Sequence, residues 1–252
     1  MRRRFFVEKF EAGTASLRGE AAHHLGRVLR AESGQLYELS DGERVWLART
    51  ESVARDEVQF SLVEPLPAPV APVRFELLLA IVKFDRLEWA LEKATELGAD
   101  EIVPLAAERS EKGLIAAAGK RAERWKRILA ESAQQSRRLR IPDLRDVVKP
   151  RDIFRPSHAT VRLVLSERAG ARPLREILEP AVLATRNGDA TRLAIAIGTE
   201  GGWTDTEFAA AAAGGFEEAA LGTNILRTET AVCAALAAVQ YAFGAFRTKS
   251  GN

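Results

Sequence analysis

The stretch LAIAIGTEGGWTDTE, residues 193–207, decides the fold. Its apolar run Leu193–Ile197 predicts a buried strand, and the helix that follows opens with a capping box, Thr204-Asp205-Thr206-Glu207. Ligands of open α/β sheets bind where a strand ends and the chain turns into a helix, and glycine lets the backbone approach a ligand closely. The turn Gly198–Gly202 is therefore a candidate small-molecule site, although such a turn can also be a plain connection.

The same alternation of strands and helices extends outward from this stretch. Further strands are predicted at Phe75–Val82, Glu101–Leu105 and Val161–Leu165, and further helices at Phe84–Leu97, Lys120–Arg138 and from Glu229 to about Phe246. Strands that alternate with helices favour an α/β domain with a mainly parallel sheet.

The first 66 residues have a different pattern. Short β-like runs at Arg4–Val7, Gln35–Leu39, Arg44–Thr50 and Glu57–Val63 surround one helical patch at Glu20–Arg30, which predicts a small barrel. The segment PLPAPVAP, residues 65–72, is too rich in proline to continue a strand or a helix. We therefore expect two domains, 1–66 and 73–248.

The composition excludes several classes of protein. With 252 residues, 46% hydrophobic and 29% charged, the chain has enough apolar surface to fold, so it is not a disordered protein. Its single cysteine, Cys233, excludes an intrachain disulfide, and its three histidines lack metal-ligand spacing, so we expect no metal site. The longest apolar run, Ala231–Phe246, is shorter than the ~20 residues of a membrane span, and we expect a cytoplasmic protein.

Positive charge is concentrated in one part of the chain. Residues 109–155 hold 14 basic and 6 acidic side chains, whereas the whole chain has a net charge of only +2. Such a local excess predicts a surface for a polyanion, and arginine, which dominates it, suits bidentate phosphate contacts. The alternative for the run Lys120–Arg140 is an ordinary solvated helix.

A second turn near the carboxyl end repeats the arrangement of the first. In LGTNILRTET, residues 221–230, a glycine and a short apolar pair precede Arg227 and Glu229 at a predicted helix start. The alternative is that Glu229 only complements the helix dipole and pairs with Arg227 at the surface. From the residues alone, the chain is a two-domain α/β protein with a small-molecule loop and a localised basic surface.

Six segments together resemble one known family. They are RRRFF (2–6), HHLGRVLR (23–30), KFDRLEWALEKATELGADEIVPLAAERS (83–110), ERWKRILAESAQQSRR (123–138), IGTEGGWTDTE (197–207) and LGTNILRTETA (221–231). In this order they resemble the ribosomal RNA small subunit methyltransferase E family, SPOUT-class enzymes that methylate N3 of a uridine in 16S ribosomal RNA. Thr199 stands where the family usually has proline, and Asn224 where it commonly has arginine.

The resemblance implies a fold and partners that periodicity did not indicate. The first domain would be a PUA-like RNA-binding barrel, and the second a SPOUT methyltransferase domain with a trefoil knot. The protein would act as a homodimer on 16S ribosomal RNA or the small ribosomal subunit, with neither membrane nor metal. Two alternatives remain, a SPOUT methyltransferase acting on another RNA and a non-enzymatic RNA-binding factor of ribosome assembly.

The resemblance also implies site residues. S-adenosylmethionine would lie among Leu165, Ser166, Glu167, Ile197, Gly198, Thr199, Glu200, Gly201, Gly202, Leu221, Gly222, Ile225, Leu226 and Arg227. As catalytic residues, Arg227 would stabilise negative charge on the uracil, and Glu200 or Glu229 would orient Arg227 or accept the N3 proton. RNA phosphates would be held by Arg2, Arg3, Arg4, His24, Arg27, Arg30, Arg137 and Arg138.

Overall fold

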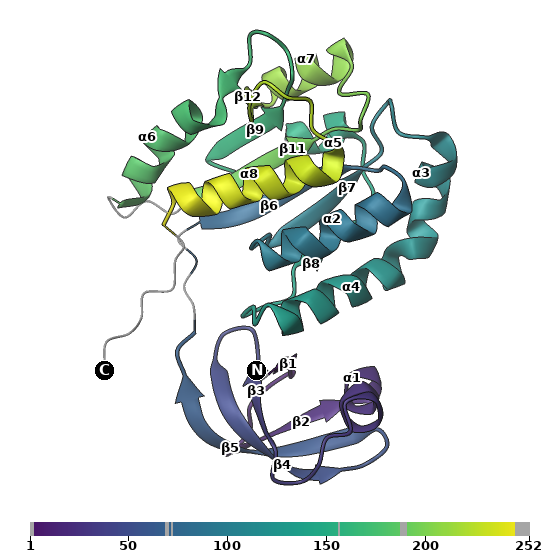
Figure 1. Ribbon diagram of the computed structural model, residues 1–252, viewed down its shortest axis with the longest axis vertical. Coiled ribbons are helices and arrows are strands. Elements are labelled where there is room, and N and C mark those ends of the chain that lie inside the picture. The colour runs from purple at the N-terminus through teal and green to yellow at the C-terminus, as the bar shows by residue number, and fades with distance from the viewer. Residues whose placement is uncertain (1–2, 69–70, 72, 156, 187–190, 245–252) are drawn as a thin grey trace. The chain divides into compact units, whose positions relative to one another are not determined.

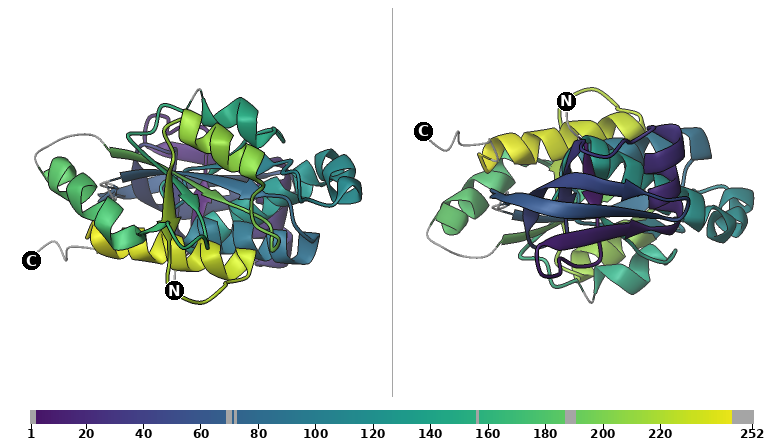
Figure 2. Two further views of the ribbon diagram at one scale, coloured as in Figure 1. Left: turned by 90° about the horizontal axis from the view of Figure 1, so that it is seen from above. Right: turned by 90° about the horizontal axis from the view of Figure 1, so that it is seen from below.

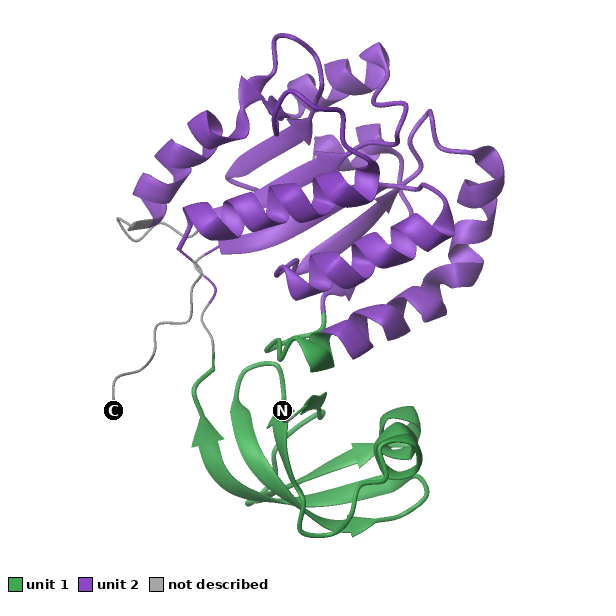
Figure 3. Cartoon of the chain, viewed as in Figure 1, with its two compact units in different colours: residues 1–70, 133–141 green, residues 71–132, 142–252 purple. Residues whose placement is uncertain are grey.

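The chain divides into two compact units (Figure 3). The computed structural model describes residues 3–68, 71, 73–155, 157–186 and 191–244. Unit 1 comprises residues 1–70 and 133–141, and unit 2 comprises residues 71–132 and 142–252. The division at residue 70 falls inside the proline-rich segment. Residues 133–141, in contrast, join unit 1 although the sequence analysis had placed them in the second domain.

Unit 2 is built on a parallel sheet (Figure 1). Within the described part of the chain the sheet has seven strands in the order β10-β12-β9-β11-β6-β7-β8, and every pairing between them is parallel. The strands are β6 (Val73–Ala80), β7 (Glu101–Leu105), β8 (Asp143–Leu144), β9 (Val161–Leu165), β10 (Arg172–Pro173), β11 (Thr191–Ile197) and β12 (Glu217–Ala220). This confirms the predicted α/β class.

Helices cover both faces of this sheet (Figure 2, left). They are α2 (Phe84–Glu96), α3 (Lys112–Ala118), the 3₁₀ turn η2 (Gly119–Arg121), α4 (Ala122–Gln135), α5 (Pro150–Phe154), α6 (Leu174–Arg186), α7 (Asp205–Ala213) and α8 (Thr228–Ala242). Side chains on β6 alternate between two cores: Leu77 and Leu79 pack with α2, α6 and α8, whereas Leu78 and Ala80 pack with α5 and α7. The central strands are apolar on both faces for this reason.

Some elements and boundaries differ from the sequence-based expectations. Helix α6 and strand β12 were not expected from the sequence. Helix α6 contains Pro180, a residue that normally interrupts a helix, and β12 begins with two glutamates rather than an apolar run. Helix α4 ends at Gln135 instead of Arg138, and Arg137 has a φ of +56°. Helix α8 ends at Ala242, two residues before Gly244 with a φ of +64°. The expected end at Phe246 lies outside the described residues.

Unit 1 contains a second, separate sheet. Its described strands, in the order β1-β3-β4-β5-β2, are antiparallel except for the parallel pair β1 and β3. They are β1 (Arg4–Phe6), β2 (Thr14–Arg18), β3 (Leu36–Ser40), β4 (Val45–Val53) and β5 (Glu57–Leu66). The core contains Phe5, Leu25 and Phe60, all buried.

The helical patch of unit 1 is not one α-helix. The α-helical turn α1 (Gly19–His23) continues as a π-helix, η1 (His24–Val28), in which the Leu29 amide donates a 3.0 Å hydrogen bond to the His24 carbonyl. Leu25, the second residue of η1, is its buried residue and packs in the core of unit 1.

Arg4 lies inside unit 1. Only 3% of the residue is exposed, and its guanidinium pairs with Glu38 at 2.8 Å and donates to the Arg137 carbonyl at 2.7 Å. A buried arginine that is paired in this way is not available to a phosphate of RNA. The expectation that Arg4 holds RNA is therefore corrected: Arg4 attaches residues 137–138 to the sheet of unit 1.

The contact between α5 and α7 provides a stability test. A Cβ atom on Gly214 would lie 2.5 Å from the Phe154 carbonyl oxygen, so Gly214→Ala forces backbone to move and should destabilise the fold by about 1–3 kcal/mol. Gly113→Ala in α3 is the matched control, since nothing lies within 4 Å of its Cβ position. In urea unfolding, Gly113→Ala should be as stable as the wild type or slightly more stable. Equal stability of the two variants would contradict the close packing.

Candidate functional site

A cavity of about 310 Å³ lies in unit 2, among the segments that follow β9, β11 and β12. Parallel strands bring their carboxyl ends to one edge of a sheet, so three segments distant in sequence meet there. The cavity is lined by Arg109, Leu165, Ser166, Glu167, Arg168, Ile197, Gly198, Thr199, Gly202, Trp203, Asp205, Phe208, Ala219, Leu221, Gly222, Asn224, Ile225, Leu226, Thr228 and Ala231. Its volume is at the lower end of the roughly 300–1,000 Å³ of small-molecule sites.

Most residues that the resemblance assigned to a cofactor lie in this wall. Glu200, Gly201 and Arg227 are the exceptions, because they do not line the cavity. The other lining residues, among them Arg109, Arg168, Trp203 and Asp205, were not expected from the sequence. Two of these, Trp203 and Asp205, directly follow the glycine-rich turn, so their neighbourhood in sequence was a usable signal. Arg168 directly follows the assigned residue Glu167, and Arg109 lies in the family-like segment 83–110, but no role was assigned to either arginine from the sequence.

The glycine-rich turn is closed by its own backbone. The Gly202 amide donates to the Thr199 carbonyl at 2.8 Å, and Gly202 has a φ of +72°, which glycine adopts without strain. A Cβ atom on Gly198 would lie 3.1 Å from the Trp203 ring, so this position also has little space for a side chain. The Thr199 hydroxyl, in the place of the family's proline, is buried without a hydrogen-bond partner.

Two side-chain hydrogen bonds join the segments around the cavity. Thr228, the first residue of α8, donates its hydroxyl to the Gly198 carbonyl at 3.0 Å and so connects the second turn to the first. The Trp203 indole N–H donates to the Leu165 carbonyl at 3.2 Å and connects the first turn to the end of β9. Both side chains are about 95% buried or more, so both bonds are shielded from water.

The three predicted catalytic residues are not joined to one another. Glu200 forms an ion pair with Arg86 of α2, a residue that the sequence analysis did not single out. Arg227 is exposed at the N-cap of α8 and, among the described residues, forms no hydrogen bond or ion pair. One carboxylate oxygen of Glu229 is buried without a hydrogen-bond partner. The expectation that Glu200 or Glu229 orients Arg227 is therefore corrected.

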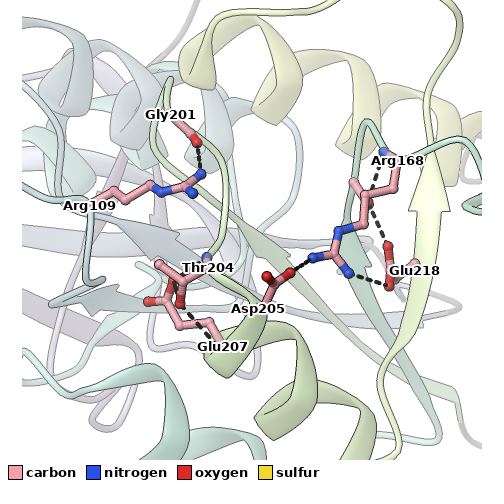
Figure 4. Close-up of polar contacts among 8 residues, drawn as sticks. Arg109, Arg168, Gly201, Thr204, Asp205, Glu207 and Glu218 are labelled. Carbon is pink, nitrogen blue, oxygen red and sulfur yellow. Dashed lines mark hydrogen bonds and ion pairs between the residues drawn. The ribbon is translucent and has the colours of Figure 1, made fainter.

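Two arginines approach the turn-to-helix segment 201–205 from opposite sides (Figure 4). Arg168 forms an ion pair with Asp205, lies 3.8 Å from Glu218 and stacks on the Phe208 ring at 3.8 Å. Arg109 donates to the Gly201 carbonyl. The cavity is therefore lined by apolar, polar and charged side chains, with Arg109 and Arg168 among the charged ones, which suits a ligand that has both an apolar and a polar part.

The remaining predicted RNA-binding residues lie in unit 1. Arg3, Arg27 and Arg30 are exposed and His24 is partly exposed. Arg137 Nη1 lies 3.3 Å from Glu38 Oε1. The next residue, Arg138, is partly buried. Arg2 lies outside the described residues.

Other chemistries have little support in the described residues. These contain no group of three or more His, Cys, Asp or Glu side chains placed to hold a metal ion. Burial raises the pKa of the Cys233 thiol on α8, so this thiol is not an activated nucleophile. No described helix is long and apolar enough to cross a membrane.

Comparison with known proteins identifies the relatives of the chain. Residues 69–240 match the family model of an RNA methyltransferase domain. The ribosomal RNA small subunit methyltransferase E of Bacillus subtilis is 31% identical over 246 residues, which are 94% of this chain and 96% of that protein. Its namesake from Synechocystis is 32% identical over 92% of this chain and 74% of that protein.

Solved structures resemble the whole chain. The crystal structure of a ribosomal RNA small subunit methyltransferase E from Neisseria gonorrhoeae, bound to S-adenosyl methionine, has a TM-score of 0.83 and 28% identity over 96% of this chain and 98% of that one. A Legionella pneumophila protein in complex with the bound cofactor SAM has a TM-score of 0.82 and 30% identity over the same shares.

The bond between the two turns can be tested by deleting one hydroxyl. Thr228→Val keeps the shape of the side chain but leaves the Gly198 carbonyl without its partner, which should lower the free energy of unfolding by about 1–2 kcal/mol. Thr230→Val, at an exposed position of the same helix, is the control and should change the free energy of unfolding by less than about 0.5 kcal/mol. Denaturant unfolding of both variants measures the difference. A Thr228 variant as stable as its control would show that the bond does not hold the turns.

Proposed function

Because this chain belongs to the ribosomal RNA small subunit methyltransferase E family of RNA methyltransferases, we propose that it transfers a methyl group from S-adenosylmethionine to N3 of a specific uridine in 16S ribosomal RNA. The observation that carries the proposal is the cavity lined jointly by the turns 198–202 and 221–226. The Neisseria and Legionella structures, which resemble this chain over nearly its full length, contain this cofactor.

The residues of the cavity fit such a cofactor. Leu165, Ile197, Leu221 and Leu226 offer an apolar surface to an adenine ring, and the glycine-rich turn offers backbone groups without obstructing side chains. The Thr199 hydroxyl lines the cavity and lacks a partner, and one Glu229 oxygen is also unsatisfied. Buried polar atoms normally have partners, so the Thr199 hydroxyl, which lines the cavity, favours a ligand with hydrogen-bonding groups. These residues hold the cofactor in our proposal.

The chemistry is divided between cofactor and protein. The cofactor, when bound, supplies an electrophilic methyl group on a sulfonium. The protein aligns the uridine with it and excludes water, and such alignment lowers the barrier of a displacement. The N3 proton must leave before or during transfer, which requires a base or a group that stabilises the resulting negative charge. Arg227 is exposed next to the cavity-lining Leu226 and Thr228, and we propose that it contacts the target nucleotide.

Glu200 and Glu229 take different parts in this proposal. Arg86 neutralises Glu200, so Glu200 acts as a holder of the glycine-rich turn rather than as a proton acceptor. Glu229 does not line the cavity itself, but it follows the cavity-lining Thr228 and keeps one buried, unpartnered oxygen, and we propose it as the acceptor of the N3 proton. The target base must leave its stack to reach a cavity of this kind.

RNA binding belongs to unit 1 in our proposal. The exposed Arg3, Arg27 and Arg30 with His24 would contact phosphates, and Arg138 would join them from the segment 133–141. The five-stranded sheet would be a PUA-like barrel spanning residues 1–66. The domain of residues 73–248 would carry the trefoil knot of the SPOUT class and pair with a second copy to form a homodimer.

Two other functions compete with this proposal. A SPOUT methyltransferase that acts on another RNA would have the same cavity and the same basic residues. A non-enzymatic factor of ribosome assembly would have the basic residues but no use for the cavity. Isothermal titration calorimetry with S-adenosylmethionine distinguishes our proposal from the assembly factor, because a protein that only binds RNA would give no heat of cofactor binding.

The decisive experiment is methylation of purified small ribosomal subunits with labelled cofactor, followed by mass spectrometry of the nucleosides. We expect one N3-methyluridine per subunit, and Arg227→Ala should reduce the rate more than tenfold with little change in cofactor affinity. Methylation of a different nucleoside, or of transfer RNA only, would overturn the substrate assignment. Arg175→Ala on α6, exposed and remote in sequence from both turns, is the control and should leave the rate unchanged.

A further inference from the structure

Arg109 differs from the other arginine in the cavity wall. The charge of Arg168 is compensated by Asp205 and Glu218, and its guanidinium stacks on Phe208. Arg109 donates to a neutral group, the Gly201 carbonyl, and no carboxylate among the described residues pairs with it. It therefore brings an uncompensated positive charge, with N–H donors to spare, to the edge of the cavity.

The loop that carries Arg109 is held in place by a buried carboxylate. Glu207 of α7 is only 5% exposed, and its Oε1 accepts a 2.9 Å hydrogen bond from the Glu108 amide. Its Oε2 accepts a 2.9 Å hydrogen bond from the Thr204 amide and closes the capping box of α7. One side chain thus attaches the loop after β7 to the start of the helix that follows the glycine-rich turn.

The glycines of the turn leave space for this arginine. A Cβ atom on Gly201 would lie 3.3 Å from the Arg109 Cδ, and one on Gly202 would lie 3.8 Å from its Nη1 and 3.2 Å from Glu167 Oε1. A side chain at position 201 would require the Arg109 side chain to shift slightly, and one at position 202 would also be strained by the positive φ of that residue. The glycine pair therefore permits both the backbone turn and the approach of Arg109.

We infer that Arg109 is a catalytic residue that binds a uracil oxygen of the target uridine, and that Glu207 is its positioning residue. The inference rests on the proposed function. As the N3–H bond breaks, its proton goes to a base and its electron pair spreads over the ring and its two carbonyl oxygens. N3 then forms a bond to the methyl carbon while the bond from that carbon to sulfur breaks, and sulfur keeps the electron pair. Arg109 stabilises the negative charge on oxygen before the new bond consumes it.

The other cations are less suited to this role. Arg86 is neutralised by Glu200 and Arg168 by Asp205. Arg227 does not line the cavity. Arg109 lines the cavity and forms no ion pair among the described residues, so less of its charge is compensated within the protein than that of Arg86 or Arg168.

Arg109→Ala tests the inference, since the side chain is exposed and its loss should not affect folding. Single-turnover methylation of small subunits should slow about 100-fold, as expected for the loss of one charge-stabilising donor. The rising limb of its pH profile should move to higher pH, because N3 then loses its proton without help. Arg109→Lys should restore part of the rate, and calorimetry should find the affinity for S-adenosylmethionine changed less than threefold.

The outcomes separate this inference from the proposed function. An inactive wild type would refute the proposed function itself. If the wild type is active but the rate of Arg109→Ala is within twofold of the wild-type rate, only the role of Arg109 is refuted. The same holds if the pH profile of Arg109→Ala is not shifted. A cofactor affinity that falls as much as the rate would mean that Arg109 holds the cofactor carboxylate, which also overturns the inference.

A double-mutant cycle tests the positioning role of Glu207. Glu207→Gln should slow transfer in the wild-type background, because the amide cannot accept both backbone hydrogen bonds. In the Arg109→Ala background the same change should have no further effect on the rate. Equal effects in the two backgrounds would mean that Glu207 acts only through the stability of α7, and would overturn its positioning role.

Discussion

The hydrogen bond from the Thr228 hydroxyl to the Gly198 carbonyl joins the two turns that form the cavity. The parallel sheet brings the ends of β9, β11 and β12 to one edge, but it does not determine how the turns that follow them meet. The Thr228 hydroxyl fixes the relative positions of the turns that follow β11 and β12. The Trp203 indole connects the first of these turns to the end of β9 through the Leu165 carbonyl. The cavity thus depends on two buried donors whose acceptors are backbone carbonyls.

Charge in this chain is organised by pairing across the sequence. The basic excess of residues 109–155 predicted a polyanion surface, but Arg121 and Arg124 both contact Glu88 of α2, which lies outside that segment. Arg4 likewise pairs with Glu38 in the interior of unit 1. A count along the sequence treats each charge as free, whereas the fold neutralises part of it. Arg109 has no such partner among the described residues, and only the structure, not the composition, distinguishes it from the other arginines.

Departures from the family pattern are accommodated locally. Thr199 replaces a proline in the glycine-rich turn, and the Gly202 amide still closes that turn on the Thr199 carbonyl. The substitution adds a buried hydroxyl to the wall of the cavity. Asn224, in the place of an arginine, also lines the cavity. Both residues therefore contribute polar groups to the wall of the cavity.

Local sequence determined the parts of this protein that depend on neighbouring residues. The apolar run of β11, the capping box of α7 and the glycine-rich turn between them are properties of residues 191–207, and each could be predicted from the type and spacing of those residues. Tertiary structure alone decided which distant groups meet: Glu200 with Arg86, Glu207 with the Glu108 amide, and Arg109 with the glycine pair. These contacts span about a hundred residues or more of chain, and hydrophobic periodicity carries information only about the face of one element, not about the partner that covers it.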